Sequence, residues 1–294
     1  MARRLLALAL AVVAFAVVAA VADAPAPDAA NPCAGGARTG RYSLVVQSGG
    51  IKRYALVNVP PKVRSGRPLP LVLVLHGAGG NGRDMERYTG MSGTADRYGF
   101  VAVYPSSVPK FWNITASAKK PDDVAFIRTL VDTVESQVCV DPARIYATGV
   151  SNGGGMVALL GCAMSDRIAA IAPVAGNYVP LPPCTPQHPV SMLEIHGTSD
   201  RSVPYRIVPG WVGTWLRLDG CSLNMRTSRP AVGQMRYDAG PCSAGSRVSH
   251  LELFGGEHEW PAPANGAVWS FFSRLRLAPA TATAARASAR PPSR

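Results

Sequence analysis

Residues 144–155 read RIYATGVSNGGG, and this stretch decides the fold. The β-branched and aromatic run IYAT predicts a strand that ends at Gly149. The apolar run MVALL at residues 156–160 predicts a helix that begins just beyond Gly155. The stretch is therefore predicted to form a strand, a sharp turn and a helix.

The turn has the pattern Gly-x-Ser-x-Gly, at residues 149–153. A serine at such a turn is held in a strained backbone conformation, and side chains at the two glycine positions would collide with the neighbouring strand and helix. The pattern makes Ser151 a candidate nucleophile. Ordinary strand-to-helix turns in glycine-rich loops also contain it, so the assignment depends on what the rest of the chain contributes.

The N-terminus has the features of a secretory signal. Arg3 and Arg4 precede an unbroken apolar run over residues 5–22, which ends in the small-x-small cleavage pattern AVA. We expect a signal peptide over residues 1–22, a secreted protein, and no membrane association after cleavage. The alternative is a retained anchor, which would leave the protein periplasmic or membrane-anchored, because the apolar run just reaches spanning length. The absence of a basic stop-transfer flank favours cleavage.

Six cysteines follow the predicted signal. An even number in an exported chain predicts disulfide bonds, and the absence of C-x-x-C spacing argues against zinc or redox sites. Sequence alone leaves the pairing open. Our expectation is Cys221–Cys242, which would close a short excursion before the last strand, together with Cys162–Cys184 and Cys33–Cys139.

The charge of the chain points to no nucleic-acid partner. The formal net charge is +12, but the basic residues do not gather with aromatic residues in one stretch. A soluble basic surface explains the charge, which leaves room for a weak preference for acidic polymers. The hydrophobic share of 47% and the charged share of 16% are those of a globular protein.

Strand and helix patterns alternate from residue 71 to residue 277, which predicts an α/β fold with a mostly parallel sheet flanked by helices. Two strand-like runs, at 41–46 and 51–59, predict an antiparallel hairpin at its N-terminal edge. We expect one catalytic domain over residues 41–277, after a flexible lead-in at 23–40 and before a disordered tail at 278–294. Further strands are expected at 71–75, 100–104, 168–174, 190–195 and 248–254, and helices from Asp122 or Asp123, around 211–218 and over 268–277.

Three loops at the carboxyl ends of predicted strands carry the groups that acyl transfer needs. Ser151 follows one strand, Asp200 a later one, and His258 the last. The chain order Ser, Asp, His is that of the α/β-hydrolases. Ser151 would attack an ester carbonyl, His258 would move its proton to the leaving alcohol, and Asp200 would hold the imidazole in the required tautomer.

Other residues compete for two of these roles. Asp219 or Asp238 could replace Asp200, which is preferred because it closely follows a buried strand. Of the other histidines, His76 and His196 precede glycines at strand ends and are expected to be structural, His188 lies in a loop, and His250 alternates within a strand.

The oxyanion formed by the attack requires two backbone N–H donors. We expect one from Asn152, directly after the nucleophile, and one from Ala78 in the loop HGAGGNG at residues 76–82. This loop lacks the P-loop ending and the G-x-G-x-x-G fingerprint, so a nucleotide site is not expected. Trp112 and Trp260 flank the predicted site and are candidate walls of an acyl pocket, although either could equally belong to the core.

Seven motifs together resemble the secreted esterases grouped as polyhydroxybutyrate depolymerases, feruloyl esterases and acetyl xylan esterases, over about residues 40–275. They are LHG at 75–77, WN at 112–113, DDV at 122–124, GVSNGG at 149–154, APVAG at 172–176, HGTSD at 196–200 and GGEHEWP at 255–261. One departure is Glu257, because the family usually has a third glycine before the histidine.

The resemblance implies a serine esterase without cofactor or metal, with Ser151, Asp200 and His258 as its triad. Its substrates would be hydroxyalkanoate oligomers or, alternatively, feruloyl or acetyl esters of plant polysaccharide. We expect no extra polymer-binding domain, which favours soluble oligomers over solid polyester. A peptidase of the same fold and an inactive surface-binding relative are the remaining alternatives.

Overall fold

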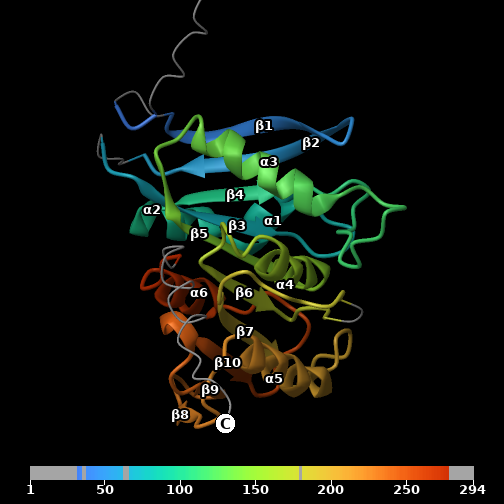
Figure 1. Cartoon of the computed structure of the whole chain (residues 1–294), viewed down its shortest axis with the longest axis vertical. Helices are drawn as coiled ribbons and strands as arrows, with labels where there is room; N and C mark the ends of the chain where they lie inside the picture. Colours follow the sequence, from blue (N-terminus) through green and yellow to red (C-terminus); the bar gives the residue numbers. More distant parts are fainter. Residues whose placement is uncertain (1–31, 35–37, 62–65, 179–180, 278–294) are drawn as a thin grey trace, which may run out of the picture. The chain divides into compact units, whose positions relative to one another are not determined.

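Ten strands form a single sheet in the residues that the structure, a computed structural model, describes: 32–34, 38–61, 66–178 and 181–277 (Figure 1). The predicted signal peptide at 1–22, most of the lead-in and the tail at 278–294 lie outside these residues. The strands are β1 (Gly40–Ser48), β2 (Ile51–Val59), β3 (Leu69–Leu75), β4 (Val101–Pro105), β5 (Val140–Val150), β6 (Ala170–Val174), β7 (Ser191–Gly197), β8 (Arg226–Ser228), β9 (Gln234–Asp238) and β10 (Val248–Leu253).

The sheet has the order β1-β2-β4-β3-β5-β6-β7-β10-β9-β8, and its six central strands are parallel. β1 and β2 form the predicted antiparallel hairpin at one edge. All seven residues of β3 are buried, as expected for a strand covered on both faces. The predicted α/β fold with a mostly parallel sheet is therefore confirmed.

The other edge of the sheet was not predicted. β9 pairs antiparallel with β10, and β8 pairs antiparallel with β9. All three residues of β8 are exposed, and those of β9 are only half-buried. Because neither strand is buried on one face, neither shows the apolar alternation that identifies strands in a sequence. Both strands were therefore missed.

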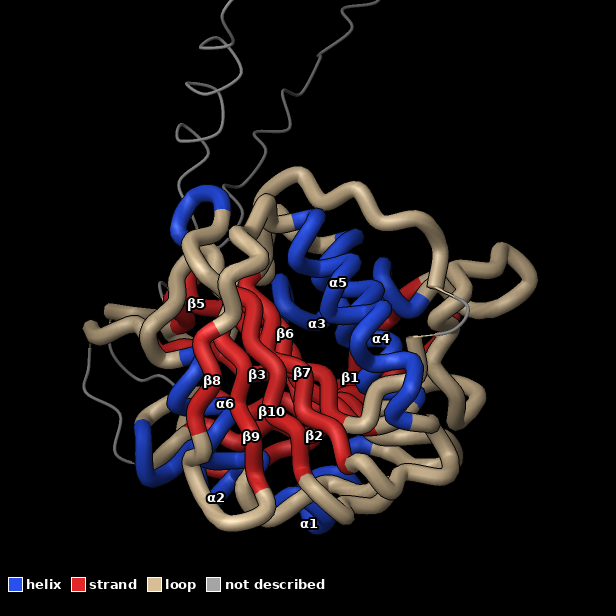
Figure 2. The backbone as a smooth tube through the Cα atoms, turned by 90° about the horizontal axis from the view of Figure 1, so that it is seen from below, coloured by secondary structure: helices blue, strands red, loops and turns tan. Residues whose placement is uncertain are grey.

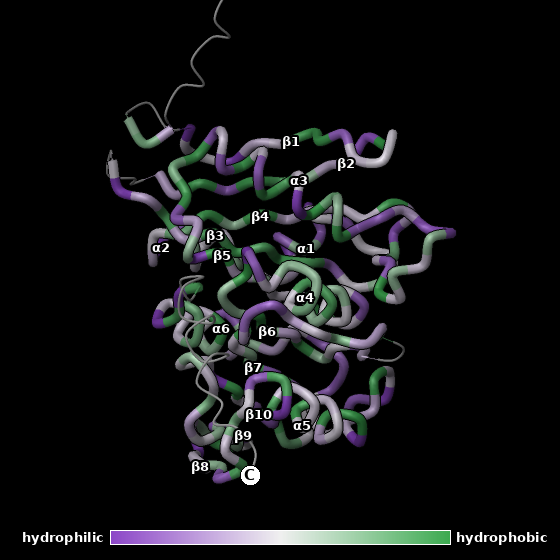
Figure 3. Tube along the Cα trace, viewed as in Figure 1, coloured by the Kyte–Doolittle hydropathy of each residue, from purple (hydrophilic) through white to green (hydrophobic). Residues whose placement is uncertain are grey.

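Six α-helices of the described residues cover the two faces of the sheet (Figure 2). α3 (Asp123–Glu135), α4 (Asn152–Ala163) and α5 (Val208–Leu218) pack on one face, where they share a core with the sheet. α1 (Gly82–Thr89), α2 (Met91–Tyr98) and α6 (Ala264–Phe272) cover the other. Apolar residues are correspondingly concentrated in the central strands and the helices packed on them (Figure 3). None of these helices is long and apolar enough to cross a bilayer.

Two predicted helix boundaries were wrong. α4 begins at Asn152 rather than beyond Gly155, so the three glycines are helical. Their neighbours explain the composition: a Cβ at Gly155 would lie 2.2 Å from the Asn177 carbonyl oxygen. α6 covers Ala264–Phe272 rather than 268–277, because the chain then turns and the Leu277 N–H donates to the Ala143 carbonyl.

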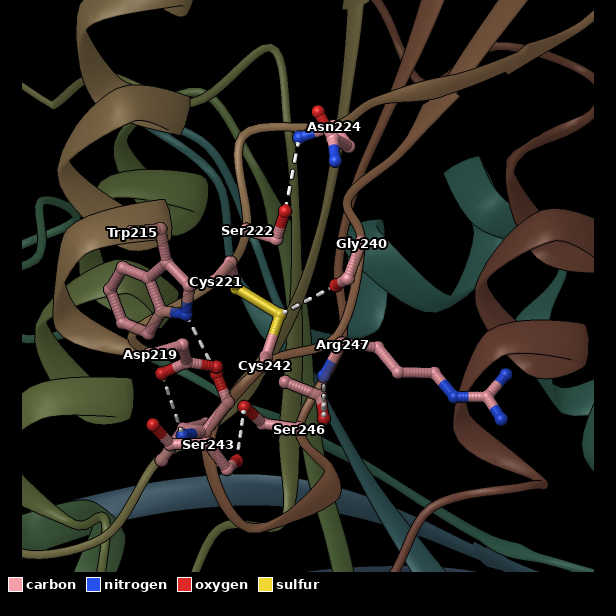
Figure 4. Close-up of a disulfide and its surroundings, with 12 residues drawn as sticks. Trp215, Asp219, Cys221, Ser222, Asn224, Gly240, Cys242, Ser243, Ser246 and Arg247 are labelled. Atoms are coloured by element: carbon pink, nitrogen blue, oxygen red, sulfur yellow. Dashed lines mark hydrogen bonds between the residues drawn. A yellow bond between two sulfur atoms is a disulfide. The ribbon is translucent and has the colours of Figure 1, made fainter.

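All three expected disulfides are present: Cys33–Cys139, Cys162–Cys184 and Cys221–Cys242. The last joins the chain after α5 to the loop after β9 (Figure 4). Two backbone bonds flank it, from the Ser222 N–H to the Pro241 carbonyl and from the Ser243 N–H to the Asp219 carbonyl. The cross-link fastens the antiparallel edge to α5, where apolar burial is small.

Candidate active site

Ser151 lies at the sharp turn between β5 and α4, with φ 58° and ψ −120°. A non-glycine residue in this region carries strain of about 1–3 kcal/mol, which the surroundings must balance. Three hydrogen bonds do so. The Ser151 N–H donates to the Val174 carbonyl, and the Ser151 carbonyl accepts from Gly155 and Asn177, each at 3.0 Å. The side chain of this strained residue is half-exposed.

The glycines on either side of Ser151 are needed because the end of β3 passes close by. A Cβ at Gly149 would lie 2.7 Å from the Leu75 carbonyl oxygen. At Gly153 it would lie 2.4 Å from the His76 carbonyl oxygen and 2.5 Å from that of Leu75. These contacts are with backbone atoms, which cannot rotate away, so the collision expected from the pattern is real.

Asp200 and His258 are in direct contact. The His258 Nδ1 atom lies 2.7 Å from Asp200 Oδ2. The other carboxylate oxygen accepts the N–H groups of Ser202 and Val203, at 2.9 and 2.8 Å. The carboxylate is buried, whereas the imidazole is 24% exposed. The alternative aspartates lie elsewhere: Asp219 is beside a disulfide and Asp238 pairs with Arg236.

The three candidate residues follow the carboxyl ends of three parallel strands. Ser151 follows β5, Asp200 follows β7 and His258 follows β10, and these strands run parallel in one region of the sheet. The loops that carry Asp200 and His258 are joined by backbone bonds, including Ser199 N–H to the Gly256 carbonyl at 2.9 Å. The carboxylate and the base therefore sit on two loops that support each other.

The glycine-rich loop after β3 passes against Ser151, since a Cβ at Gly77 would lie 3.5 Å from the serine Cβ. Gly79 donates its N–H to the Lys110 carbonyl, and Gly80 donates to Gly77. The N–H of Ala78 has no acceptor among the described residues. Asn152 is the first residue of α4, where a backbone N–H has no acceptor within the helix. Both expected oxyanion donors thus have an N–H to offer.

Trp112 is buried, with 2% of its surface exposed, and connects the Ser151 turn to the glycine-rich loop after β3. Its indole N–H donates to the His76 carbonyl at 2.9 Å, and its backbone N–H donates to Asn152 Oδ1 at 2.7 Å. The Asn152 side chain also donates to the Trp112 carbonyl at 3.3 Å. This clamping role of the Asn152 side chain was not predicted, although the residue was singled out for its backbone.

Trp260 is buried as well, at 8% exposed. Its indole N–H donates to Asn265 Oδ1 and its backbone N–H to the Tyr88 hydroxyl. Both tryptophans therefore lie in the core, which is one of the two environments that the sequence allowed. Their contact with substrate stays a prediction.

A buried ion pair behind the loop of Trp112 was also missed. Arg53 of β2 contacts Asp123 at 2.5 Å, and the other carboxylate oxygen accepts the Asn113 N–H at 2.7 Å. Of the two aspartates expected to cap α3, Asp122 does so, by accepting the Ala125 N–H. Asp123 instead anchors the loop to the sheet. The sequence did not indicate which of the two adjacent aspartates caps the helix and which anchors the loop.

Comparison with known proteins gives matches over most of the chain. The model of a family described as esterase PHB depolymerase matches residues 52–208, which include Ser151 and Asp200. The "Putative esterase NocK" of Nocardia uniformis subsp. tsuyamanensis is 32% identical over 253 residues, covering 74% of this chain and 73% of that protein. Feruloyl esterase B of Piromyces equi is 28% identical over 76% of this chain, which spans about half of that relative, 46%.

Solved structures show the same fold at low sequence identity. An acetyl xylan esterase from Aspergillus awamori superposes with a TM-score of 0.65 at 15% identity, over 79% of this chain and 99% of that one. S-formylglutathione hydrolase from Staphylococcus aureus gives a TM-score of 0.57 at 14% identity, over 80% and 98%. At such identities the similarity establishes the architecture, which is that of the α/β-hydrolases.

Proposed function

We propose, since this chain belongs to the esterase PHB depolymerase family and is an enzyme acting on carboxylic ester bonds, that Ser151, Asp200 and His258 are its catalytic triad. The observation that carries the proposal is the 2.7 Å contact of His258 with Asp200, at the carboxyl end of the parallel strands, where the partly exposed Ser151 occupies a strained turn. The chain order of the three residues is that of the α/β-hydrolases.

In this scheme His258 removes the Ser151 hydroxyl proton as the serine oxygen attacks the ester carbonyl. The carboxylate of Asp200 accepts from Nδ1, which leaves Nε2 as the basic nitrogen toward the serine. The imidazolium then protonates the leaving alcohol, and an acyl group remains on Ser151. Water, activated by the same imidazole, releases the acid and restores the serine.

The tetrahedral intermediates carry a negative oxygen, which we assign to the N–H groups of Asn152 and Ala78. The placement of Asn152 at the start of α4 adds the positive end of the helix dipole. Loss of one such donor typically costs about 100- to 1,000-fold in kcat. The Trp112 bonds to His76 and Asn152 hold the two donors at a fixed separation.

For the substrate we propose short hydroxyalkanoate oligomers, in line with the description of the matching family. A cavity of about 470 Å³ borders Asn81 of the glycine-rich loop after β3, but Ser151, Asp200 and His258 are not among its lining residues. Its lining combines the apolar surfaces of Tyr54, Leu56, Val108 and Pro109 with the cationic Lys110.

Feruloyl or acetyl esters of plant polysaccharide are the second candidate substrates. The observation in their favour is that relatives matching about three quarters of this chain are named as feruloyl and acetylxylan esterases. We further propose that the protein is secreted, because three disulfides are stable in an oxidising compartment.

The test compares the protein with its Ser151→Ala variant on p-nitrophenyl acetate and butyrate. We expect the variant to lose a factor of about 10³ or more in kcat. Equal turnover by the two proteins would refute the assignment. A product assay on hydroxybutyrate trimer, methyl ferulate and acetylated xylan then separates the substrate proposals, with the trimer expected to give the highest kcat/KM.

A further inference from the structure

The Asp200 carboxylate contacts a second histidine besides His258. The Nε2 atom of His196, at the end of β7, lies 3.2 Å from Asp200 Oδ2, the same oxygen that contacts His258. The two imidazoles therefore approach one carboxylate oxygen, and the nitrogens concerned are within about 6 Å of each other. His196 is 1% exposed, so its contacts are shielded from solvent.

Both ring nitrogens of His196 face acceptors. Nδ1 lies 2.9 Å from Glu194 Oε1, and Nε2 lies 2.8 Å from the Val203 carbonyl oxygen as well as near Asp200. A neutral imidazole carries one proton and would leave one nitrogen lone pair against an oxygen lone pair. The imidazolium satisfies both sides. Burial lowers the pKa of His196, but the Glu194 hydrogen bond and charge outweigh it, and the net pKa is raised.

Glu194 is fully buried and is surrounded by donors. Its Oε1 also accepts the Tyr178 hydroxyl at 3.1 Å, and its Oε2 lies 2.6 Å from His250 Nδ1 on β10. The latter contact lacks the direction of a hydrogen bond, but the two atoms have no other partner among the described residues. Burial raises the pKa of Glu194, but the hydrogen bond from His196 and the close His250 imidazole outweigh burial, so the net pKa is lowered.

We propose that Glu194 and His196 form a buried ion pair that acts as a positioning pair for Asp200, placing a permanent positive charge behind the carboxylate that holds His258. The proposal rests on the catalytic triad proposed above. The cation fixes Asp200 as a carboxylate and offsets part of its charge, which opposes premature protonation of His258. The base then stays competent at lower pH than it would with a neutral His196.

Other groups around His196 are consistent with this assignment. Tyr205, from the short 3₁₀-helix η1 (Tyr205–Ile207), approaches edge-on with ring centroids 6.1 Å apart. Its hydroxyl contacts His250 Nε2 at 3.0 Å and not His196. Among the described residues no cluster of His, Cys, Asp or Glu is arranged to hold a metal ion.

The test uses Glu194→Gln, which keeps the shape of the side chain and removes its charge. The matched control is Glu252→Gln: Glu252 is also buried, pairs with His196 in the sheet register, and accepts the Tyr237 hydroxyl instead. In Glu194→Gln we expect His196 to become neutral, so that the positive charge about 6 Å from His258 is lost. The acid limb of the kcat/KM profile should then move up by about one pH unit in Glu194→Gln and stay in place in the control.

Two results would overturn the proposal: an unmoved limb in Glu194→Gln, or a uniform loss of activity at every pH, which indicates a packing role only. Failure of the triad itself is recognised separately, because Ser151→Ala would then keep its activity.

A second measurement does not depend on catalysis or on the folding of Glu194→Gln. Nitrogen NMR of the 15N-histidine-labelled protein reports the protonation of each ring nitrogen, and the five histidines are assigned with single His→Gln variants. We expect His196 to be protonated on both nitrogens at pH 7. A nonprotonated ring nitrogen on His196 at that pH contradicts the ion pair.

Discussion

Single residues at the Ser151 turn explain why a short pattern made this serine a candidate nucleophile. Gly149 and Gly153 touch backbone carbonyls of the β3 end, so any side chain there would push the strand and the oxyanion loop apart. This requirement is local, and sequence therefore revealed it. The contact between Asp200 and His258 was predictable for a different reason, since strand ends in a parallel sheet share an edge.

Gly153→Ala tests this account of the elbow. We expect a loss of about 1–3 kcal/mol or more in the free energy of unfolding, because the new methyl group would meet two carbonyl oxygens. The control is Gly93→Ala in α2, where a Cβ meets nothing within 4 Å and a gain of about 0.5–1 kcal/mol is expected. Urea unfolding of both variants measures the difference. Similar stability of the two would show that the elbow tolerates a side chain.

Whole elements were predictable where they are buried on both faces. The apolar runs of β3, β4, β6 and β7 have no alternative to the sheet interior. α1 and α2 were missed, because one follows directly on the glycine-rich loop and the two are separated by a single residue, Gly90.

Trp112 shows a further limit of prediction from sequence. A tryptophan beside a site can line a pocket or support a loop, and only its contacts in the structure decide between these roles.

Trp112→Phe separates these two roles. If the indole N–H supports the oxyanion loop through the His76 carbonyl, kcat should fall by about tenfold, equally for p-nitrophenyl acetate and butyrate. A change in the preference between the two esters, expressed in KM, would instead place Trp112 in the acyl pocket. Trp269→Phe is the control, because Trp269 lies on α6, where it stacks on Phe100, and its replacement should leave both rates unchanged.

At the scale of the molecule, the sheet interior carries charge that no sequence pattern signalled. Glu194 and His196 lie in a strand whose seven residues are all buried, and the sequence led only to the expectation that His196 is structural. All three expected disulfide pairings are present, although only Cys221–Cys242 was expected for a stated reason, the short excursion that it closes. Long-range polar networks depend on which strands become neighbours, and sequence did not give the order β7, β10 and β9.

The raised pKa of Asp219 predicts how the stability of the whole fold depends on pH. It is fully buried beside the Cys221–Cys242 disulfide (Figure 4). Burial raises its pKa to about 7, which the Ser246 hydroxyl and the Val190 N–H only partly oppose. Below the pKa of an unfolded aspartate, about 3.9, both states are protonated and no charge is buried. Between about pH 3.9 and about pH 7 the unfolded state gives up the proton that the folded state keeps, so the folded state loses stability as pH rises, and the loss is complete above about pH 7.

Asp219→Asn should remove this part of the pH dependence. Relative to the variant, the wild-type protein is expected to lose up to about 4 kcal/mol of unfolding free energy between pH 4 and pH 8. Urea unfolding at both pH values, with the disulfides intact, provides the measurement. Parallel pH dependence of the two proteins would mean that Asp219 stays charged at no cost to the fold.

The central claim is that Ser151 carries the acyl group, and trapping that intermediate tests it most directly. Rapid mixing of the protein with p-nitrophenyl butyrate, an acid quench and peptide mass mapping locate any acyl adduct. We predict a burst of about one p-nitrophenol per enzyme and a butyryl group on the peptide containing Ser151. Turnover with the adduct on another residue, or with unmodified Ser151 throughout the burst, would contradict the account.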